Sequence, residues 1–180
     1  MTGDSVRDVQ WAILDSPDRL AHPLLRRLHA GWQAARPADG LPGHDFVDPA
    51  ALNYLLGSLL VVGVQRDAAG AMRFQYRLIG TDLVARRGRD STGLWMDEHA
   101  DPEVARSGPP ACRLAVQSRG PVRITAARMI FKQRYPLEYL LLPLVADDGD
   151  TIDRLLIAQI YPPDAPRLPY AGSAPPMPKP

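Results

Sequence analysis

The chain has 180 residues, of which 46% are hydrophobic, and it carries a formal net charge of +1. This length and apolar content fit one domain with a buried core, and the balanced charge gives no global field that would attract a polyanion. The single cysteine, Cys112, excludes an internal disulfide, and no apolar run is long enough to cross a bilayer. We therefore expect a cytoplasmic protein that binds neither nucleic acid nor membranes.

The first part of the chain is expected to contain a flexible start and a helix. Residues 1–9 are polar, and we expect residues 1–18 to form a flexible N-terminus. A helix is predicted from Leu24 because apolar residues then recur at helical spacing, and Pro37 ends it. The apolar stripe of this helix can pack on its own sheet or form a homodimer with a second copy. It consists of Leu24, Leu25, Leu28 and Trp32.

A hairpin is predicted over Leu59 to Leu78. From Met72 to Leu78 every second residue is apolar and the residues between are Arg or Gln, a pattern typical of a half-buried antiparallel strand. The run from Leu59 to Val64 is apolar and β-branched, and the turn-forming residues 67–70 separate the two runs.

A short helix is predicted directly after this hairpin. Gly80 ends the second strand and Gly88 ends the helix. Leu83 and Val84 are expected to point inward. Three basic residues are expected to face water: Arg86, Arg87 and Arg89.

The second half of the chain predicts one more helix and three more strands. The helix covers Pro109 to Arg119, and the strands cover Pro121 to Ile130, Tyr139 to Val145 and Asp153 to Tyr161. Residues 162–180 are rich in proline and are expected to be a disordered tail. Residues 19–161 are thus expected to form a single domain. Two groups of strands around a helical crossover predict an α+β fold, an antiparallel sheet with helices over one face.

This order of elements resembles the PAS fold, and the similarity extends over about Leu20 to Tyr161. The most specific segments are FQYRLIGTDL at Phe74 to Leu83 and GRDSTG at Gly88 to Gly93, with EYLLLPL at Glu138 to Leu144 in support. The chain is most similar to a family of bacterial PAS-like proteins. The resemblance implies a five-stranded antiparallel sheet with helices on one face, plus an N-terminal flanking helix.

The same resemblance implies a sensory or regulatory module that is not an enzyme. It would bind a small apolar ligand or a protein partner and signal in trans, with no cofactor identified. The alternative is a constitutive interaction or scaffold domain whose core is filled by its own side chains. A small α+β enzyme is a third possibility. The residues expected to line a ligand pocket are Phe74, Tyr76, Leu78, Leu83, Trp95, Ile124 and Leu142.

Two residues match cofactor sites that some PAS domains carry. His99 is the histidine in the region where some members bind haem, and its ordinary alternative is a surface loop residue. Cys112 precedes Arg113, but the surrounding residues do not match the flavin motif, so we expect a small buried side chain.

Two charged clusters have simpler explanations than a binding site. The arginines of residues 73–89 could form a patch that binds an anion or nucleic acid, but no aromatic residues interleave with those on the strand, so a solvated face is expected. The aspartates at 147–153 could bind Ca²⁺, but they lack the spacing of a calcium loop, and a hairpin turn is expected. No zinc spacing, nucleophile elbow or phosphate loop occurs in the sequence.

Overall fold

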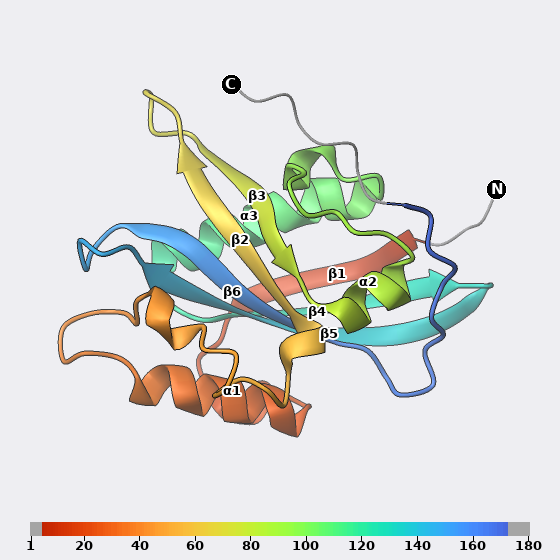
Figure 1. Cartoon of the computed structure of the whole chain (residues 1–180), viewed down its shortest axis with the longest axis horizontal. Coiled ribbons are helices and arrows are strands. Elements are labelled where there is room, and N and C mark those ends of the chain that lie inside the picture. Colours follow the sequence, from red (N-terminus) through yellow and green to blue (C-terminus); the bar gives the residue numbers. More distant parts are fainter. Residues whose placement is uncertain (1–4, 173–180) are drawn as a thin grey trace.

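Six strands form one antiparallel sheet in the computed structural model, which describes residues 5–172. Hydrogen bonds join the strands in the order β1-β4-β5-β6-β2-β3 (Figure 1). The α+β expectation is confirmed, and the expectation of five strands is wrong by one. The strands are β1 (Ser5–Ile13), β2 (Leu59–Arg66), β3 (Met72–Ile79), β4 (Val122–Ile130), β5 (Gln133–Val145) and β6 (Ile152–Ile160).

The additional strand, β1, comes from the segment that was expected to be flexible. It pairs with β4 at one edge of the sheet, with Val6 opposite Arg128 and Trp11 opposite Ile124. The pairing is interrupted between Arg7 and Gln10, where Asp8 has a φ of 54°. This bulge breaks the alternation that would have marked a strand in the sequence. The expectation for residues 1–4 lies outside the described residues.

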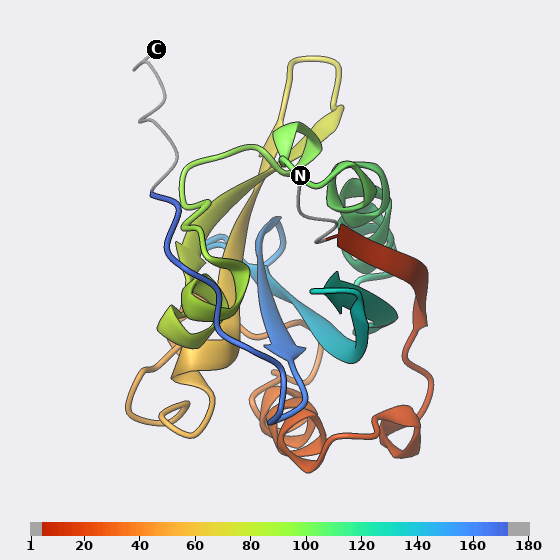
Figure 2. The same ribbon diagram turned by 90° about the vertical axis from the view of Figure 1, so that its right-hand side faces the viewer.

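Helices cover both faces of the sheet, not one face as expected. Helix α1 (Pro23–Ala34) lies below the sheet, and α2 (Thr81–Arg87) and α3 (Pro102–Ser118) lie above it (Figures 1 and 2). The two faces are visible along β5, where Glu138 accepts hydrogen bonds from the backbone at the start of α1 while Tyr139 faces the side of α3. No helix among the described residues is long and apolar enough to cross a membrane.

The expected N-terminal flanking helix is wrong, because the described chain begins with strand β1. Helix α1 follows that strand and lies within the fold. Leu25, Leu28 and Trp32 have no exposed surface, and the Trp32 indole donates a hydrogen bond of 3.1 Å to the Pro143 carbonyl in β5. The apolar stripe is therefore covered within one chain. It gives no reason to place a second copy on this helix, and the homodimer stays an untested prediction.

The hairpin of β2 and β3 forms as predicted, with one irregularity that matters for the site. Val61 pairs with Leu78 and Val62 pairs with Tyr76, so Arg77 is an extra residue on β3. A bulge of this kind turns the following side chains to the opposite face. Leu78 is consequently 49% exposed, and Ile79 is buried in its place.

The C-terminal segment packs along α2, in contrast to the disorder expected from residue 162 onward. We call residues 162–172 the strap; it is the dark blue segment beside α2 in Figure 2. Leu168 and Ala171 donate backbone hydrogen bonds to the carbonyls of Ala85 and Gly88, at 2.8 and 2.6 Å. Arg86 adds a hydrogen bond of 2.6 Å to the Ala165 carbonyl. Residues 173–180 lie outside the described part of the chain.

Candidate functional site

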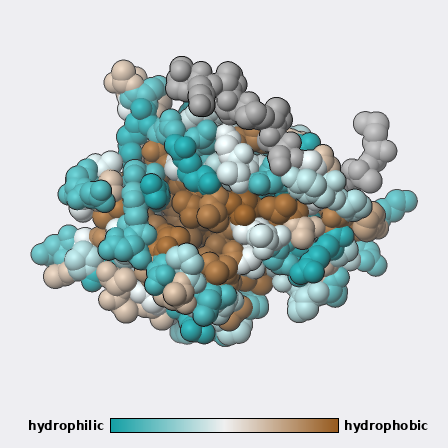
Figure 3. All heavy atoms as spheres, viewed as in Figure 1, coloured by the Kyte–Doolittle hydropathy of each residue, from teal (hydrophilic) through white to brown (hydrophobic). Residues whose placement is uncertain are grey.

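A cavity of about 940 Å³ lies between the sheet and α3. The strap, the end of α2 and the loop between α2 and α3 complete its wall. In the same orientation as Figure 1, hydrophobic residues gather in the middle of the molecular face and hydrophilic residues surround them (Figure 3). A cavity of this size is within the range that holds small organic ligands in other proteins.

Aliphatic side chains form a large part of the wall because strand alternation directs one side of each strand toward α3. One cross-strand row places Leu141, Ile157 and Leu60 on neighbouring strands β5, β6 and β2. The β1 bulge brings both Val6 and Val9 to this side, although they would lie on opposite faces of a regular strand. Further apolar wall residues are Met96, Val104, Ile124, Ala126, Ile130 and Leu168.

A second cross-strand row supplies polar groups to the same cavity. Arg87, the last residue of α2, donates from Nη2 to Oε1 of Gln159 on β6, and Gln159 donates from Nε2 to the Tyr139 hydroxyl at 3.0 Å. The other terminal nitrogen of Arg87, Nη1, is buried without a hydrogen-bond partner among the described residues. A buried charged donor without an acceptor is energetically unfavourable, so this atom marks a position where an acceptor would bind well.

His99 lies in the cavity wall and is neutral at physiological pH. Burial, together with the nearby Arg87 and Arg128 cations, lowers its pKa to about 4. Its Nδ1 accepts a hydrogen bond of 3.0 Å from the Asp101 backbone, which assigns the ring proton to Nε2. The ring also contacts Tyr76 edge to face at 6.1 Å between centroids. The neutral ring thus has one N–H that can donate.

Asp101 connects β1 to α3 at the edge of the cavity. Its carboxylate accepts from the Val6 backbone at 2.7 Å and, as the N-cap of α3, from the Glu103 backbone at 3.0 Å. Both oxygens are therefore already engaged by the protein itself.

Cys112, the other cavity residue with possible reactivity, is buried as expected. Burial raises the pKa of its thiol to about 12, and its sulfur lies 3.8 Å from that of Met96. The thiolate, the reactive form, is thus disfavoured at neutral pH.

Two of the seven residues predicted to line a pocket do so: Tyr76 and Ile124. Phe74 and Leu83 are buried in the core but do not reach the cavity. Leu142 lies on the opposite face of β5, with Leu141 in the position expected for it. Leu78 is exposed because of the β3 bulge.

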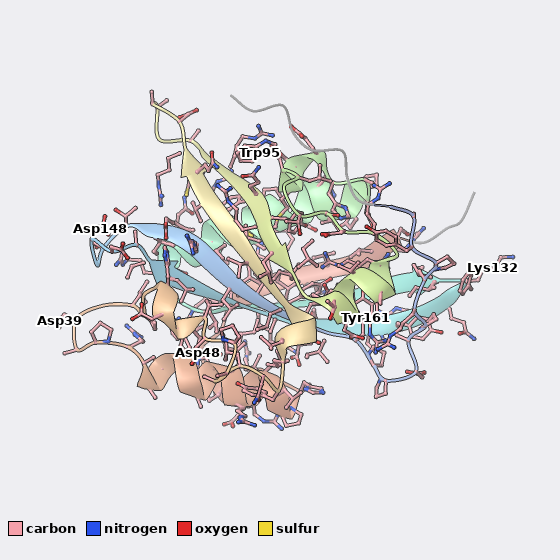
Figure 4. All side chains as sticks on the ribbon, viewed as in Figure 1. Asp39, Asp48, Trp95, Lys132, Asp148 and Tyr161 are labelled. Atoms are coloured by element: carbon pink, nitrogen blue, oxygen red, sulfur yellow. The ribbon has the colours of Figure 1, made fainter. Side chains whose placement is uncertain are left out.

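Trp95 lies outside the cavity, in the loop between α2 and α3 (Figure 4). The guanidinium of Arg73 lies over its ring, 4.3 Å from the centroid, and also pairs with Asp97 and Glu98. Arg73 is thereby paired with two carboxylates at the surface.

The main functional residue that the sequence did not reveal is Arg87. Arg86, Arg87 and Arg89 were expected to face water, but Arg86 pairs with Asp82 at 2.8 Å under the strap and Arg87 points into the cavity. Figure 4 shows Tyr161 beside α2, where the Arg86 guanidinium lies 5.4 Å from its ring centroid. Only the strap, which was expected to be disordered, makes this side of α2 an interior surface.

The acidic turn at residues 147–153 is stabilised by hydrogen bonds from its own backbone to an aspartate side chain. The Asp148 carboxylate accepts from the backbone of Asp150 and Thr151, and Asp153 contacts His44 at 2.6 Å. Asp148 lies at the tip of the β5–β6 hairpin (Figure 4). Within residues 5–172, no group of three or more His, Cys, Asp or Glu side chains could hold a metal ion.

A comparison with protein families agrees with this architecture. A family model described as a PAS domain matches residues 20–157. No curated protein matches the chain. One similar solved structure is described as "Structure of an RNA-binding Light-Oxygen-Voltage Receptor", with 14% sequence identity and a TM-score of 0.46. The match covers 86% of this chain and 38% of that chain, so this chain spans less than half the length of that receptor.

Proposed function

The chain belongs to the PAS domain family, and from this premise we propose that it is a non-catalytic sensory module that detects a small molecule bound in its cavity. PAS domains are in general sensory or regulatory modules. The observation that carries the proposal is the cavity of about 940 Å³, whose wall combines aliphatic side chains with polar and charged ones. This combination of walls and convergent polar groups is typical of ligand sites.

The cavity favours a ligand over the alternative of a scaffold with a self-filled core. A core filled by its own side chains would leave few spaces larger than a water molecule, whereas this pocket, which is partly open to solvent, has room for a small organic ligand. A ligand that fills it would cover its apolar wall.

The titratable groups of the wall support a binding role over catalysis. His99 is neutral and its Nδ1 is held by the Asp101 backbone, while the raised pKa of Cys112 keeps its sulfur protonated. The Asp101 carboxylate is occupied by two backbone amides. These groups are fixed or unreactive, as suits a recognition surface.

We propose that the strap reports occupancy of the cavity. Leu168, Pro169 and Ala171 form part of the cavity wall, and the same segment is bound to α2 by hydrogen bonds. A ligand that contacts these residues would shift the strap between a bound and a released arrangement. A protein partner could then recognise the surface that changes.

Native mass spectrometry of protein purified from its own host would test the proposal. The informative variant is Ala126→Phe, because Ala126 lies in the cavity wall on β4 and a phenyl ring there would occupy ligand space. The matched control is Ala12→Phe, which introduces the same side chain at an exposed position on β1.

The expected result is a bound small molecule on the wild-type protein and on the control, and none on Ala126→Phe. Denaturation would release the molecule for identification. A ligand-free mass for all three proteins, together with no change in strap proteolysis on adding metabolite extracts, would contradict the proposal and favour a constitutive interaction domain.

A further inference from the structure

The charges around the cavity are strongly unbalanced, although the net charge of the chain is only +1. Four wall residues are basic, Arg87, Arg89, Arg128 and Lys132, whereas Asp101 is the acidic one. Lys132 lies at the tip of the β4–β5 hairpin (Figure 4), so its charge is at the rim. Arg87 and Arg128 act further inside: burial lowers the pKa of His99 and both cations add to this, and both oppose the rise that burial causes in the pKa of Tyr139.

Asp101 keeps its charge and offsets part of these cations, since it raises the pKa of His99 while burial, Arg87 and Arg128 lower it. Its two oxygens already accept from the backbone of Val6 and Glu103. Arg128 donates a hydrogen bond of 3.2 Å to the Tyr161 hydroxyl. Arg87, Arg89 and Lys132 still outnumber the one acidic wall residue, so a ligand with a negative group is favoured over a neutral one.

Two donors define the place for that negative group. Nη1 of Arg87 is buried and lacks an acceptor among the described residues, and Nε2–H of His99 is the remaining donor of a neutral ring. A carboxylate has two oxygens that can accept from two donors at once, and its hydrogen bonds with guanidinium are among the strongest in proteins. Arg87 and His99 both line the cavity, and Arg87 is close enough to His99 to add to the lowering of its pKa by burial.

The remaining wall indicates the kind of body attached to this head group. Branched and unbranched aliphatic side chains form a large part of it, with examples on four strands and on α3: Val6, Leu60, Ile124, Ile157 and Val104. Such a surface buries a hydrocarbon chain favourably, in proportion to the apolar area removed from water.

We propose that the cavity binds an aliphatic carboxylate, with its head group held by Arg87 and His99 and its chain along the aliphatic wall. This inference rests on the proposed function, since it names the class of ligand for the same cavity. It also links ligand binding to signalling, because the head group would bind next to Gly88 and the strap, the segment proposed to report occupancy.

Calorimetric titration with dodecanoate and with dodecan-1-ol would test the ligand class, because the two probes share a chain length and differ in charge. The wild-type protein is expected to bind dodecanoate roughly tenfold or more tightly than the alcohol, since hydrogen bonds to charged groups exceed neutral ones by about this factor. Arg87→Gln should remove this preference while the affinity for the alcohol stays the same. Arg77→Gln, which removes an exposed arginine from β3, should behave as wild type.

The proposal would be overturned by equal affinity of the wild-type protein for both probes, a measurement that needs no variant to fold. It would also be overturned by an unchanged preference in Arg87→Gln, or by a porphyrin absorption band in the purified protein. If a neutral molecule is found in the wild-type cavity and is lost in Ala126→Phe, the proposed function stands and the carboxylate class fails. If Ala126→Phe has no effect on binding of either probe or of any co-purified molecule, both fail.

Discussion

A Cβ atom on Gly88 would lie 2.6 Å from the backbone oxygen of Pro169, so the strap fits against α2 only because position 88 has no side chain. Gly88 also has a φ of +68° and ends α2 in the left-handed conformation. Gly88 thus ends helix α2 at the cavity and also leaves room for the strap to pack against this end of the helix. The packing of the strap depends on this one position.

Gly88→Ala is expected to displace the strap. The positive φ alone costs about 1 kcal/mol for a residue with a Cβ, and the clash with Pro169 adds to it. Trypsin should cleave after Arg167, an exposed strap residue, faster in the variant than in the wild type. Rates would be measured by mass spectrometry of timed digests.

The matched control for this prediction is Gly70→Ala in the β2–β3 turn. Gly70 has a similar φ of +82°, but no atom lies within 4 Å of the position that a Cβ would take there. This variant should lose stability through the backbone alone and retain the wild-type cleavage rate at Arg167. Equal acceleration in both variants would show that general destabilisation, and not displacement of the strap, causes the cleavage.

Glu138→Gln tests how α1 is attached to the sheet. The Glu138 residue is 9% exposed, and its carboxylate accepts from the backbone of Ala21 and His22 at 3.0 Å and from Arg123 at 2.7 Å. The amide keeps the shape but replaces one acceptor with a donor and removes the charge. We expect a loss of about 1.5–3 kcal/mol in the free energy of unfolding, measured with urea.

An exposed ion pair provides the comparison. Glu98 pairs with Arg73 at 2.8 Å while its side chain is 51% exposed, so Glu98→Gln should cost less than about 1 kcal/mol. If the two substitutions cost the same, Glu138 is not the structural link that its contacts indicate.

Trp32→Phe separates packing within the chain from packing between chains. The substitution removes the hydrogen bond to the Pro143 carbonyl and part of a fully buried ring, so we expect a loss of about 2–4 kcal/mol. If α1 serves only its own sheet, the loss is the same at low and high protein concentration. A loss that shrinks at high concentration would instead support the homodimer through this helix.

The sequence predicted the elements whose signals are local. The hairpin of β2 and β3, the three later strands and the core of α1 all follow from alternation or helical spacing within one segment. Helix α3 begins at Pro102, but the sequence predicted it only from Pro109. Prolines are rare inside helices, so the sequence pattern places Pro109 and Pro110 at the start of the helix.

The cavity wall could not be predicted in full because it depends on bulges and on distant segments. A single extra residue, Arg77, moves Leu78 to the surface, and the bulge at Asp8 hides the strand that contributes Val6. Arg87 is half-buried and lines the cavity, beside the strap that covers this side of α2. Such effects are set by tertiary contacts, which override the local pattern.

The stability of the fold is expected to fall on acidification from pH 6.5 toward pH 4 because of His99. Its pKa is about 4 in the folded state and 6.5 as the reference value for the unfolded chain. Between these values the unfolded chain binds a proton that the folded protein does not, so the contribution is fully present above pH 6.5 and is lost as the pH falls toward 4. The slope contributed by one such group is at most about 1.4 kcal/mol per pH unit.

His99→Asn isolates this contribution, because the asparagine carbonyl can accept from the Asp101 backbone but the side chain does not titrate. Urea unfolding between pH 6.5 and 4.5 should show a shallower pH dependence in the variant than in the wild type. The residual slope is assigned to His29, whose pKa is also lowered by burial, while Asp82 and Asp97, with lowered pKa values, lose their contribution only below about pH 4. The charged groups that face His99 are Arg87, Arg128 and Asp101, and all three are retained in the variant. An unchanged slope in His99→Asn would mean that the pKa of His99 in the folded protein is not lowered from its value in the unfolded chain.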